Sequence, residues 1–425
     1  LPLQGHPTSN ERMMVKRLFE SASKPALLRS KEFKPQELAN TVWAFSKAAY
    51  RAPSFFDAAA VRAIEWLKQT DFGGIISSNR SVGGSSVAVV GGPGYNSGGG
   101  ADGGSGAMTM LGEFETVPNR PFLSQELTNI LYAFARAAHQ APDLYATVAQ
   151  PVVQACRNGR QNTALCEWSV QDVCNTLWSY AAADARHPEL LHACVSQLVS
   201  GHLRDNVQRS HLTQIQQFLI WWELELRMGA QSSSSGGGPP LSQLIDQQLR
   251  ERCRRALAEG DDVAGHTTSA LQREVGRGLE RLGYRYTNEF VTPEGYSLDM
   301  AITEHGPQWI AVEADGPHHF ASDGSPNGAT LLKRRQLANL GWKLVPVRYD
   351  EWYALERDLM REDAFLRAAI ANATGQPVSN IGINNMQQQP HWQAPIMQPA
   401  AASAIAANYM AAKQKAAVRP FGGAW

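Results

Sequence analysis

The stretch IAVEADGPHHF, residues 310–320, places two acids one residue apart at the end of an apolar run and follows them with two histidines. Successive side chains of a β-strand point to opposite faces, so Glu313 and Asp315 are expected to share one face of a sheet. Carboxylates that meet on one face repel each other unless a divalent cation or basic side chains neutralise them. The motif therefore predicts either a metal-dependent active site or the framework of a domain that only binds.

Other residues that could take part in this chemistry lie close by in the sequence. Asp299, in LDMAI, is expected on the neighbouring strand, where it brings a third carboxylate to the same sheet edge. If the site cleaves RNA, Asp299 and Glu313 are the predicted Mg²⁺ ligands, and His318 or His319 transfers the proton. The candidate catalytic residues are then Asp299, Glu313, Asp315 and His319. If the domain only binds, no cofactor is expected, and the acids pair with Lys333, Arg334 and Arg335.

The charge balance of the chain restricts where a nucleic acid could bind. Lys+Arg and Asp+Glu both number 39, so the formal net charge is zero and any basic surface must be local. Basic residues concentrate near the acids, and the candidate RNA-binding residues there are Lys333, Arg334, Arg335, Lys343 and Arg348. The nearby aromatic residues either offer stacking faces to bases or belong to the core; they are Trp342, Tyr349, Trp352 and Tyr353.

The elements that must position these residues form a small α/β module. Two helices are expected within 241–260 and 267–284, and a third at 328–342. The expected strands lie within 284–291, 296–302, 308–316 and 342–349. The pattern predicts three strands as a meander, then a helix and a further strand.

A repeated pattern occupies the part of the chain before residue 230. Three stretches place Gln, Asn, two aromatic residues and Pro in the same order: FKPQELANTVWAFSKAAYRAPSFF, FLSQELTNILYAFARAAHQAPDLY and WSVQDVCNTLWSYAAADARHPELL. A fainter fourth copy, LTQIQQFLIWWELEL, aligns Gln214 and Trp221 with the repeated Gln and first aromatic residue, Gln36 and Trp43 in the first copy. Each copy is predicted to form two helices that separate at the Pro, so stacked copies predict an α-solenoid.

The repeated asparagines, Asn40, Asn129 and Asn175, have two interpretations. They either bond between neighbouring hairpins or present their side chains to RNA, and we count them among the candidate RNA-binding residues. The repeated aromatic residues share a helix face with the apolar positions, which favours a core role for them.

The fold class that follows is multidomain, with an N-terminal all-α helical-repeat solenoid and a C-terminal small α/β module. We expect the array at 1–230 with a Gly/Ser-rich insertion at about 73–113, a flexible linker at 231–240, a helical lead-in at 241–290, the α/β module at 291–360 and a low-complexity, mostly disordered tail at 372–425. The five cysteines form no C-x-x-C pair and are expected as reduced core residues. No apolar run reaches the roughly 18–20 residues of a membrane span. The chain begins with Leu rather than Met, which leaves room for further repeats and a targeting peptide upstream.

The repeats resemble the octotricopeptide repeats of algal organelle proteins and the related helical repeats of the FAST-kinase-like family. The resemblance rests on the pattern Gln-Glu-Leu-Ala-Asn-Thr-x-Trp-Ala-Phe and covers about residues 33–225. It implies recognition of single-stranded RNA, with each hairpin presenting side chains to about one nucleotide.

The C-terminal module resembles the RAP domain, an RNA-binding module, over about residues 292–355. The ordered series that carries the resemblance is Leu298-Asp299, Val312-Glu313-Ala314-Asp315-Gly316-Pro317, His319-Phe320, Leu331-Leu332-Lys333-Arg334-Arg335, Leu340-Gly341-Trp342 and Tyr349-x-x-Trp352. RAP domains commonly follow helical repeat arrays in mitochondrial or chloroplast RNA-processing factors. The resemblance therefore implies a factor of this kind.

The same residues resemble a restriction-endonuclease-type core, in particular the very-short-patch repair nuclease group. Asp299 and Glu313 match the metal-binding acids of that core, whereas Asp315 stands where it has Lys. Lys333 could reach in from the helix, and a histidine could transfer the proton, as in that nuclease group. The missing Lys favours binding over cleavage.

Together these features predict an organellar RNA-binding protein of the mitochondrial matrix or chloroplast stroma, which acts in the processing, stability or translation of organelle transcripts or ribosomal RNA. Its predicted partners are single-stranded organellar RNA and ribonucleoprotein proteins. Two alternatives stay open: a metal-dependent endoribonuclease that uses the α/β module, and a protein scaffold in an organellar ribonucleoprotein.

Overall fold

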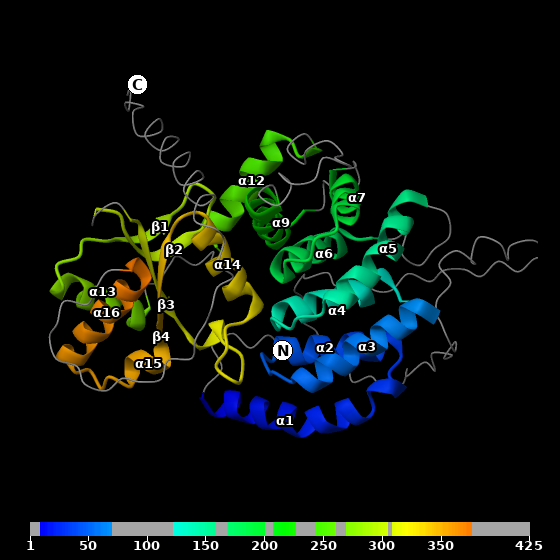
Figure 1. The fold of residues 1–425 in the computed structure, drawn as a ribbon, viewed down its shortest axis with the longest axis horizontal. Helices are drawn as coiled ribbons and strands as arrows, with labels where there is room; N and C mark the ends of the chain where they lie inside the picture. Colours follow the sequence, from blue (N-terminus) through cyan, green and yellow to red (C-terminus); the bar gives the residue numbers. More distant parts are fainter. Residues whose placement is uncertain are drawn as a thin grey trace, which may run out of the picture.

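The computed structural model of the 425-residue chain describes residues 9–69, 122–158, 168–199, 207–226, 244–260, 269–304 and 308–375. The predicted insertion at 73–113 and the predicted linker at 231–240 lie outside these ranges. The tail predicted at 372–425 also lies outside them, except for residues 372–375, which complete the last helix and its cap. The described residues form a helical array followed by a four-stranded sheet with helices on both faces (Figure 1). The predicted order, with helices first and a small sheet near the C-terminus, is confirmed.

The array consists of helical hairpins that stack side by side (Figure 1). Its first helices α2, α4, α6 and α9 pack against one another in one layer, and α3, α5 and α7 form a second layer. The bounds are α1 Ser9–Leu28, η1 Ser30–Glu32, α2 Pro35–Lys47, α3 Pro53–Gln69, α4 Ser124–Arg136, α5 Pro142–Asn158, α6 Val170–Ala183, α7 Pro188–Val199, α9 Arg209–Trp221, the π-helical η3 Trp222–Leu226 and α12 Gln247–Glu259. In the part of the chain that the structure describes, no helix combines the length and apolarity needed to cross a bilayer.

The hairpins share a capping device that fixes where each first helix begins. The third helical residue turns its side chain back and accepts a hydrogen bond of 3.0–3.1 Å from the backbone N–H of the residue before the helix. The pairs are Glu37 with Lys34, Glu126 with Leu123, Asp172 with Ser169, and His211 with Gln208. Counted from this cap, Gln214 takes the place of Asn40 rather than of Gln36. The predicted register of the fourth copy is therefore wrong, because a shift by about one helical turn preserves the apolar spacing.

An apolar core runs between the two layers of the array. The core role predicted for the repeated aromatic residues is confirmed for Phe45, Phe134 and Tyr180, which are at most 2% exposed. It is wrong for Trp43, which is 41% exposed. Each repeated proline begins the second helix of its hairpin, where a missing N–H costs no helical hydrogen bond; these are Pro53, Pro142 and Pro188. Buried free thiols also lie in this core, at Cys174, Cys194 and Cys253.

The array continues beyond its predicted end at residue 230. The sequence places α12 in a lead-in to the sheet module, but Leu249, Cys253 and Ala256 of this helix belong to the core of the array. α12 packs against α9 and so completes the fourth hairpin. The reason is that α9 has an apolar face of its own, which a single helix cannot bury.

The sheet has the strand order β1-β2-β3-β4, with β1, β2 and β3 as an antiparallel meander and β4 parallel to β3. The helices α13 and α16 cover one face, and α14 covers the face turned toward the array (Figure 1). The bounds are α13 Ala270–Arg281, β1 Thr287–Val291, β2 Ser297–Ile302, β3 Ile310–Asp315, η5 Pro317–His319, α14 Gly328–Asn339, β4 Lys343–Arg348, α15 Tyr349–Tyr353 and α16 Leu359–Thr374. The predicted meander, helix and further strand are confirmed.

The sheet module docks onto the array through α14. The carboxyl end of an α-helix carries unsatisfied carbonyl groups and a partial negative charge, which suit a cationic partner. Arg335 of α14 donates to the carbonyl groups of Ala181 and Ala182 at the end of α6. The side-chain amide of Gln336 donates to the carbonyl of Gln217 in α9 at 2.7 Å. Two consecutive residues of α14 thereby bond to two consecutive hairpins.

The loop before α14 makes a second set of contacts, with the first hairpin. The backbone N–H of Ser322 donates to the carbonyl of Ala49 at 2.7 Å, and Arg51 Nη1 donates to Ser325 Oγ at 2.7 Å. The sequence favours two parts that are joined flexibly through a linker. In the structure, the module instead packs directly against the array at both ends of α14.

Gly328, the first residue of α14, marks the closest approach between the two parts. A Cβ atom built at this position would lie 1.8 Å from the carbonyl oxygen of Ala135 in α4, whereas real Cβ contacts stay beyond 3.0 Å. Only glycine lets the first turn of α14 approach the backbone of α4 this closely.

Replacing Gly328 by Ala is predicted to lower the thermal unfolding midpoint by about 2–4 °C or more. Within a free helix the same change stabilises by about 1 kcal/mol. Here the added methyl group must push α14 away from α4, so the substitution destabilises the protein instead of stabilising it. Thermal unfolding of Gly328→Ala beside Ala329→Ser, a change at the exposed neighbour, checks this. An unchanged or raised midpoint in Gly328→Ala would contradict the close approach.

Candidate functional site

The acids of IAVEADG lie on β3, on the face that α14 covers. Continuing the antiparallel register of β2 and β3 places Asp299 opposite Glu313. Asp299 Oδ2 accepts a hydrogen bond of 2.7 Å from the backbone N–H of Ala314. Glu313 is 7% and Asp315 is 3% exposed, so both carboxylates are nearly removed from water. The structure thus brings together the three acids that the sequence singles out.

Two cations from α14 neutralise this cluster. Lys333 Nζ lies 2.5 Å from Glu313 Oε2, and Arg334 pairs with Asp315 through Nη2 and Oδ2. Neighbouring residues of the helix therefore bind alternate residues of the strand. The interaction fixes both the rotation of α14 and its height above β3.

Burial shifts the pKa values of the cluster. Removal from water raises the pKa of Glu313 from its ordinary 4.5 to about 7, although the ammonium group of Lys333 acts in the opposite direction. Burial likewise raises the pKa of Asp299. The surrounding carboxylates outweigh burial at Lys333 and raise its pKa, so this side chain keeps its proton. The group of three acids and two bases is therefore close to electrical balance near neutral pH.

His319 lies at the edge of the cluster. Its Nδ1 is 3.2 Å from Thr330 Oγ1 and 3.8 Å from Asp315 Oδ1. Burial lowers the pKa of His319 to about 4, so the ring is neutral at pH 7. His318, the other histidine of the motif, is exposed. A neutral ring could accept a proton, but its neighbours here are a hydroxyl and a carboxylate that is already paired with Arg334.

The residues present do not fit a divalent cation as they are arranged. Asp299 accepts a backbone N–H, and the ammonium group of Lys333 holds the position next to Glu313 that a metal would need. No three His, Cys, Asp or Glu side chains among the described residues are placed to hold a metal ion. Glu313 Oε1 is buried without a hydrogen-bond partner, but one oxygen atom does not make a coordination site. The cluster suits ion pairing.

The other predicted basic residues of the module are mostly engaged within the protein. Arg335 bonds to the array, as described above. Arg348 lies over the ring of Phe320 at 4.1 Å, donates to the carbonyl of Gly324 and forms an ion pair with Asp350. Lys343 is half-buried at the start of β4. These contacts leave little of the predicted positive charge open to a phosphate.

The repeated asparagines occupy different environments along the array. Asn175 is 7% exposed, and its Oδ1 accepts hydrogen bonds from Gln171 at 2.8 Å and from Gln214 of the next hairpin at 3.0 Å. Asn129 is half-buried and Asn40 is exposed. The third asparagine therefore links two hairpins, and the first is open to a ligand.

The aromatic residues near the C-terminus divide in the same way. Trp342 and Trp352 are each 2% exposed and belong to the core on the two sides of the sheet. Tyr349 is half-buried, and Tyr353 is 46% exposed. Stacking of bases on the two tryptophans would require the module to open.

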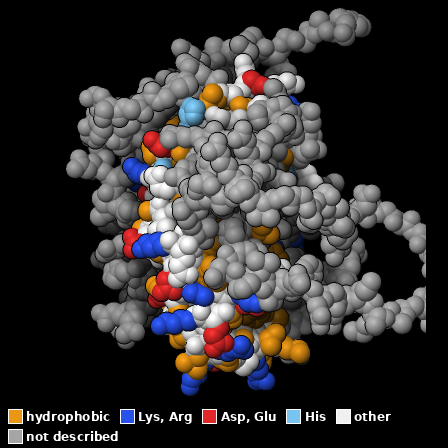
Figure 2. Space-filling view, turned by 90° about the vertical axis from the view of Figure 1, so that its right-hand side faces the viewer, with side chains coloured by type: hydrophobic (Ala, Val, Ile, Leu, Met, Phe, Trp, Pro, Cys, Tyr) orange, Lys and Arg blue, Asp and Glu red, His pale blue; other side chains and the backbone are white. Residues whose placement is uncertain are grey.

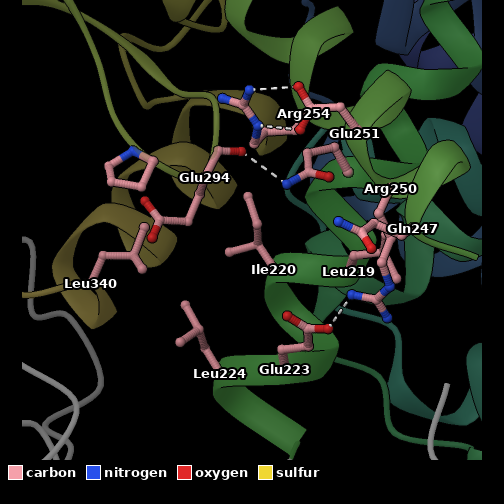
Figure 3. A pocket seen from close by; sticks show the side chains of 12 residues that line it. Leu219, Ile220, Glu223, Leu224, Gln247, Arg250, Glu251, Arg254, Glu294 and Leu340 are labelled. Carbon is pink, nitrogen blue, oxygen red and sulfur yellow. Dashed lines mark hydrogen bonds and ion pairs between the residues drawn. The ribbon is translucent and has the colours of Figure 1, made fainter. Parts of the chain in front are cut away.

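A pocket of about 330 Å³, which sequence reasoning missed, lies where the fourth hairpin meets the sheet (Figure 3). Its walls come from α9, α12, the β1–β2 turn and the end of α14. Four of the charged groups that line it pair with one another, Arg250 with Glu223 at 2.6 Å and Arg254 with Glu251 at 2.7 Å. The side-chain amide of Gln216 donates to the carbonyl of Glu294 and so ties α9 to the β1–β2 turn. No sequence motif could indicate this pocket, because it forms only when α12 joins the array.

The described side chains that Figure 2 leaves uncovered on the outer side of the array carry charges of both signs. Figure 2 shows the molecule from the side away from the sheet, where Lys and Arg side chains are interspersed with Asp and Glu in the described part. A surface of mixed sign has little attraction for a polyanion.

Comparison with known proteins identifies part of the sheet module. Residues 312–368 match the RAP domain family. The chain carries a RAP domain. A rice protein, "RAP domain-containing protein, chloroplastic" from Oryza sativa subsp. japonica, is 41% identical over 90 residues. The aligned segment covers 21% of this chain and 13% of the rice protein, so the similarity concerns a module and not the whole protein.

The matched RAP domain begins within β3 and ends within α16. It contains both ion pairs of the buried cluster, together with Arg335 and the docking face of α14. β1, β2 and Asp299 precede the match, although β2 completes the sheet on which the RAP domain is built. Arg335 and Gln336, which bond to the array, thus lie within the segment that matches the RAP domain family.

Substituting Lys333 by Met is predicted to destabilise the protein by about 3 kcal/mol or more at pH 8, because it leaves buried carboxylates without their ammonium partner. The loss is predicted to be smaller at pH 5. Without Lys333 the pKa of Glu313 in the folded state rises further above its ordinary value. Between pH 5 and pH 8 the folded variant therefore keeps a proton on Glu313 that the unfolded chain has lost, and its free energy of unfolding falls as pH increases. Urea unfolding at both pH values measures the difference. Lys343→Met, at a half-buried lysine of the same module, is the control, and an equal loss at pH 5 and pH 8 would contradict the assignment.

Proposed function

We propose that this protein is an organellar RNA-binding protein that acts in the processing, stability or translation of organelle transcripts or ribosomal RNA. The observation that carries the proposal is the RAP domain packed, through α14, onto an array of helical hairpins. A repeat array offers an extended surface to a single strand of RNA. A module fixed to the layer of α2, α4, α6 and α9 limits where that strand can bind. The resemblance of the hairpins to octotricopeptide repeats supports the same proposal.

The chloroplast stroma is the location that we propose. The support is the name of the rice relative, which places a protein with a similar RAP domain in the chloroplast. The comparisons provide no corresponding support for the mitochondrial matrix.

A second candidate function is metal-dependent RNA cleavage by the RAP domain. It is favoured by the meeting of Asp299, Glu313 and Lys333, since an acid pair with a lysine is the set that the nuclease resemblance requires. Two features weigh against it. Glu313 is nearly buried, which keeps a phosphodiester away, and Lys333 is committed to an ion pair. The third possibility is a scaffold for proteins in an organellar ribonucleoprotein.

The full chain is predicted to bind single-stranded chloroplast RNA without cutting it, with affinity falling as salt increases because phosphate contacts release counterions. A labelled RNA incubated with the protein in Mg²⁺ or EDTA, and separated on native and denaturing gels, measures both properties. Binding that is insensitive to salt would contradict phosphate contacts. RNA cleavage that requires Mg²⁺ and is lost in Glu313→Gln but kept in Glu294→Gln, a buried acid elsewhere, would establish the second candidate instead.

A further inference from the structure

An aromatic residue and a cation recur at equivalent positions of the first two hairpins. Nine residues after the cap the hairpins have Trp43, Tyr132, Trp178 and Gln217, in chain order. One helical turn further on they have Lys47, Arg136, Ala182 and Trp221. The pair of aromatic residue and cation is therefore present in hairpins one and two and missing from hairpins three and four.

The RAP domain covers Tyr132 of the second hairpin as well as the positions where the pair is missing. Leu332 of α14 packs against Tyr132 and Trp178 in a small apolar cluster. The indole N–H of Trp178 donates to Gln217 Oε1 at 2.8 Å, so the equivalent side chains of hairpins three and four bond to each other. The small side chain of Ala182 leaves its carbonyl group accessible to Arg335. These positions hold the RAP domain and are closed to a ligand.

The first hairpin is left open. Trp43 is 41% exposed, an unusual state for an indole ring, and Lys47 Nζ lies 5.4 Å from the centre of that ring. Asn40, one turn before Trp43 on the same helix, is also exposed. Trp43 thus presents an apolar ring at the surface with polar and charged groups on either side.

The cation of the second hairpin lies beside that of the first. Arg136 Nε donates to the carbonyl of Ser46 at 3.3 Å, which brings the guanidinium group next to Lys47. Burial and the charge of Arg136 together lower the pKa of Lys47. Neither cation has an acidic side chain as an ion-pair partner among the described residues. Two neighbouring cations without an acid form a site for an anion.

We propose that Trp43, Lys47 and Arg136 form a binding site for single-stranded RNA, in which a base stacks on Trp43 and its phosphate lies between the two cations. The site deepens the proposed function and rests on it. The exposed ring favours a nucleotide over a simple anion, and the cation pair favours a polyanion over an apolar protein segment. Recognition at this site depends on stacking and charge, so it tolerates any base. Because the RAP domain covers Tyr132, the stacking ring comes from the first hairpin, and the second hairpin contributes Arg136.

The proposal is tested with the full chain and a fluorescein-labelled twelve-nucleotide oligouridine, by fluorescence anisotropy. Trp43→Ala is expected to weaken binding about 10-fold, and Trp43→Phe to keep most of the affinity, because a phenyl ring still stacks. Lys47→Ala and Arg136→Gln together are expected to reduce the slope of log affinity against log salt by about 1.4, the value for two phosphate contacts with a single strand.

Matched controls separate this site from a general surface effect. Tyr353→Ala removes an aromatic residue of similar exposure from the RAP domain, and Lys68→Ala removes an exposed cation from α3; both are expected to bind like the unaltered chain. Equal thermal midpoints show that a variant is folded, and the open position of Trp43 makes this the expected result. Where a variant unfolds, the oxidation of Trp43 in the unaltered chain is measured with and without oligouridine. Slower oxidation with oligouridine supports the site, and an equal rate overturns it.

The outcomes distinguish this proposal from the broader one. Unaltered protein that binds oligouridine, with Trp43→Ala and the double variant indistinguishable from it, overturns the site and leaves the RNA-binding function standing. Unaltered protein that binds no RNA overturns the function itself. Loss of a protein crosslink in Trp43→Ala, with RNA binding unchanged, would assign the surface to a protein and also overturn the site.

Discussion

Four consecutive residues of α14, Lys333 to Gln336, hold the protein together by bonding in two directions. Lys333 and Arg334 reach the carboxylates of β3, while Arg335 reaches carbonyl groups at the end of α6 and Gln336 a carbonyl group within α9. Gln336 also accepts a hydrogen bond from Tyr296 at the start of β2. The first direction neutralises acids that would be costly to bury alone, and the second adds hydrogen bonds to backbone carbonyl groups of the array. The sheet, the helix and the array therefore depend on the same short run of residues.

This arrangement changes what the basic residues of the RAP domain can do. A Lys-Arg-Arg run in a module associated with RNA suggests a phosphate-binding surface. In the structure, these three side chains bind the carboxylates of β3 and carbonyl groups at the end of α6, and Arg348 forms an ion pair with Asp350. The same contacts make the buried acids a poor metal site, since an ammonium and a guanidinium group already neutralise them. Under the proposed function, RNA contacts lie elsewhere, and the surface formed by Trp43, Lys47 and Arg136 is the one whose charge and exposed ring suit them.

Local patterns in the sequence predict the parts of this structure well and their assembly poorly. Strand alternation places Glu313 and Asp315 on one face, and the repeated Pro residues divide the hairpins, because both effects depend only on neighbouring residues. The register of the fourth hairpin is different: one helical turn more or less leaves the apolar pattern unchanged, and only the cap at Gln208 decides. The fate of Arg335 could not be read from the sequence at all. Its partners, Ala181 and Ala182, are backbone carbonyl groups more than 150 residues away, and they carry no side-chain signal.

The central claim is that α14 holds the RAP domain in place while, as we propose, the first two hairpins bind RNA. Ultraviolet crosslinking of the full chain to single-stranded RNA, followed by mass spectrometry of the crosslinked peptides, tests this claim most directly. We predict crosslinks within residues 35–51 and 124–136 and none within residues 329–339. Crosslinks concentrated on 329–339, with 35–51 and 124–136 unlabelled, would show that α14 leaves the array to bind RNA and would contradict the account.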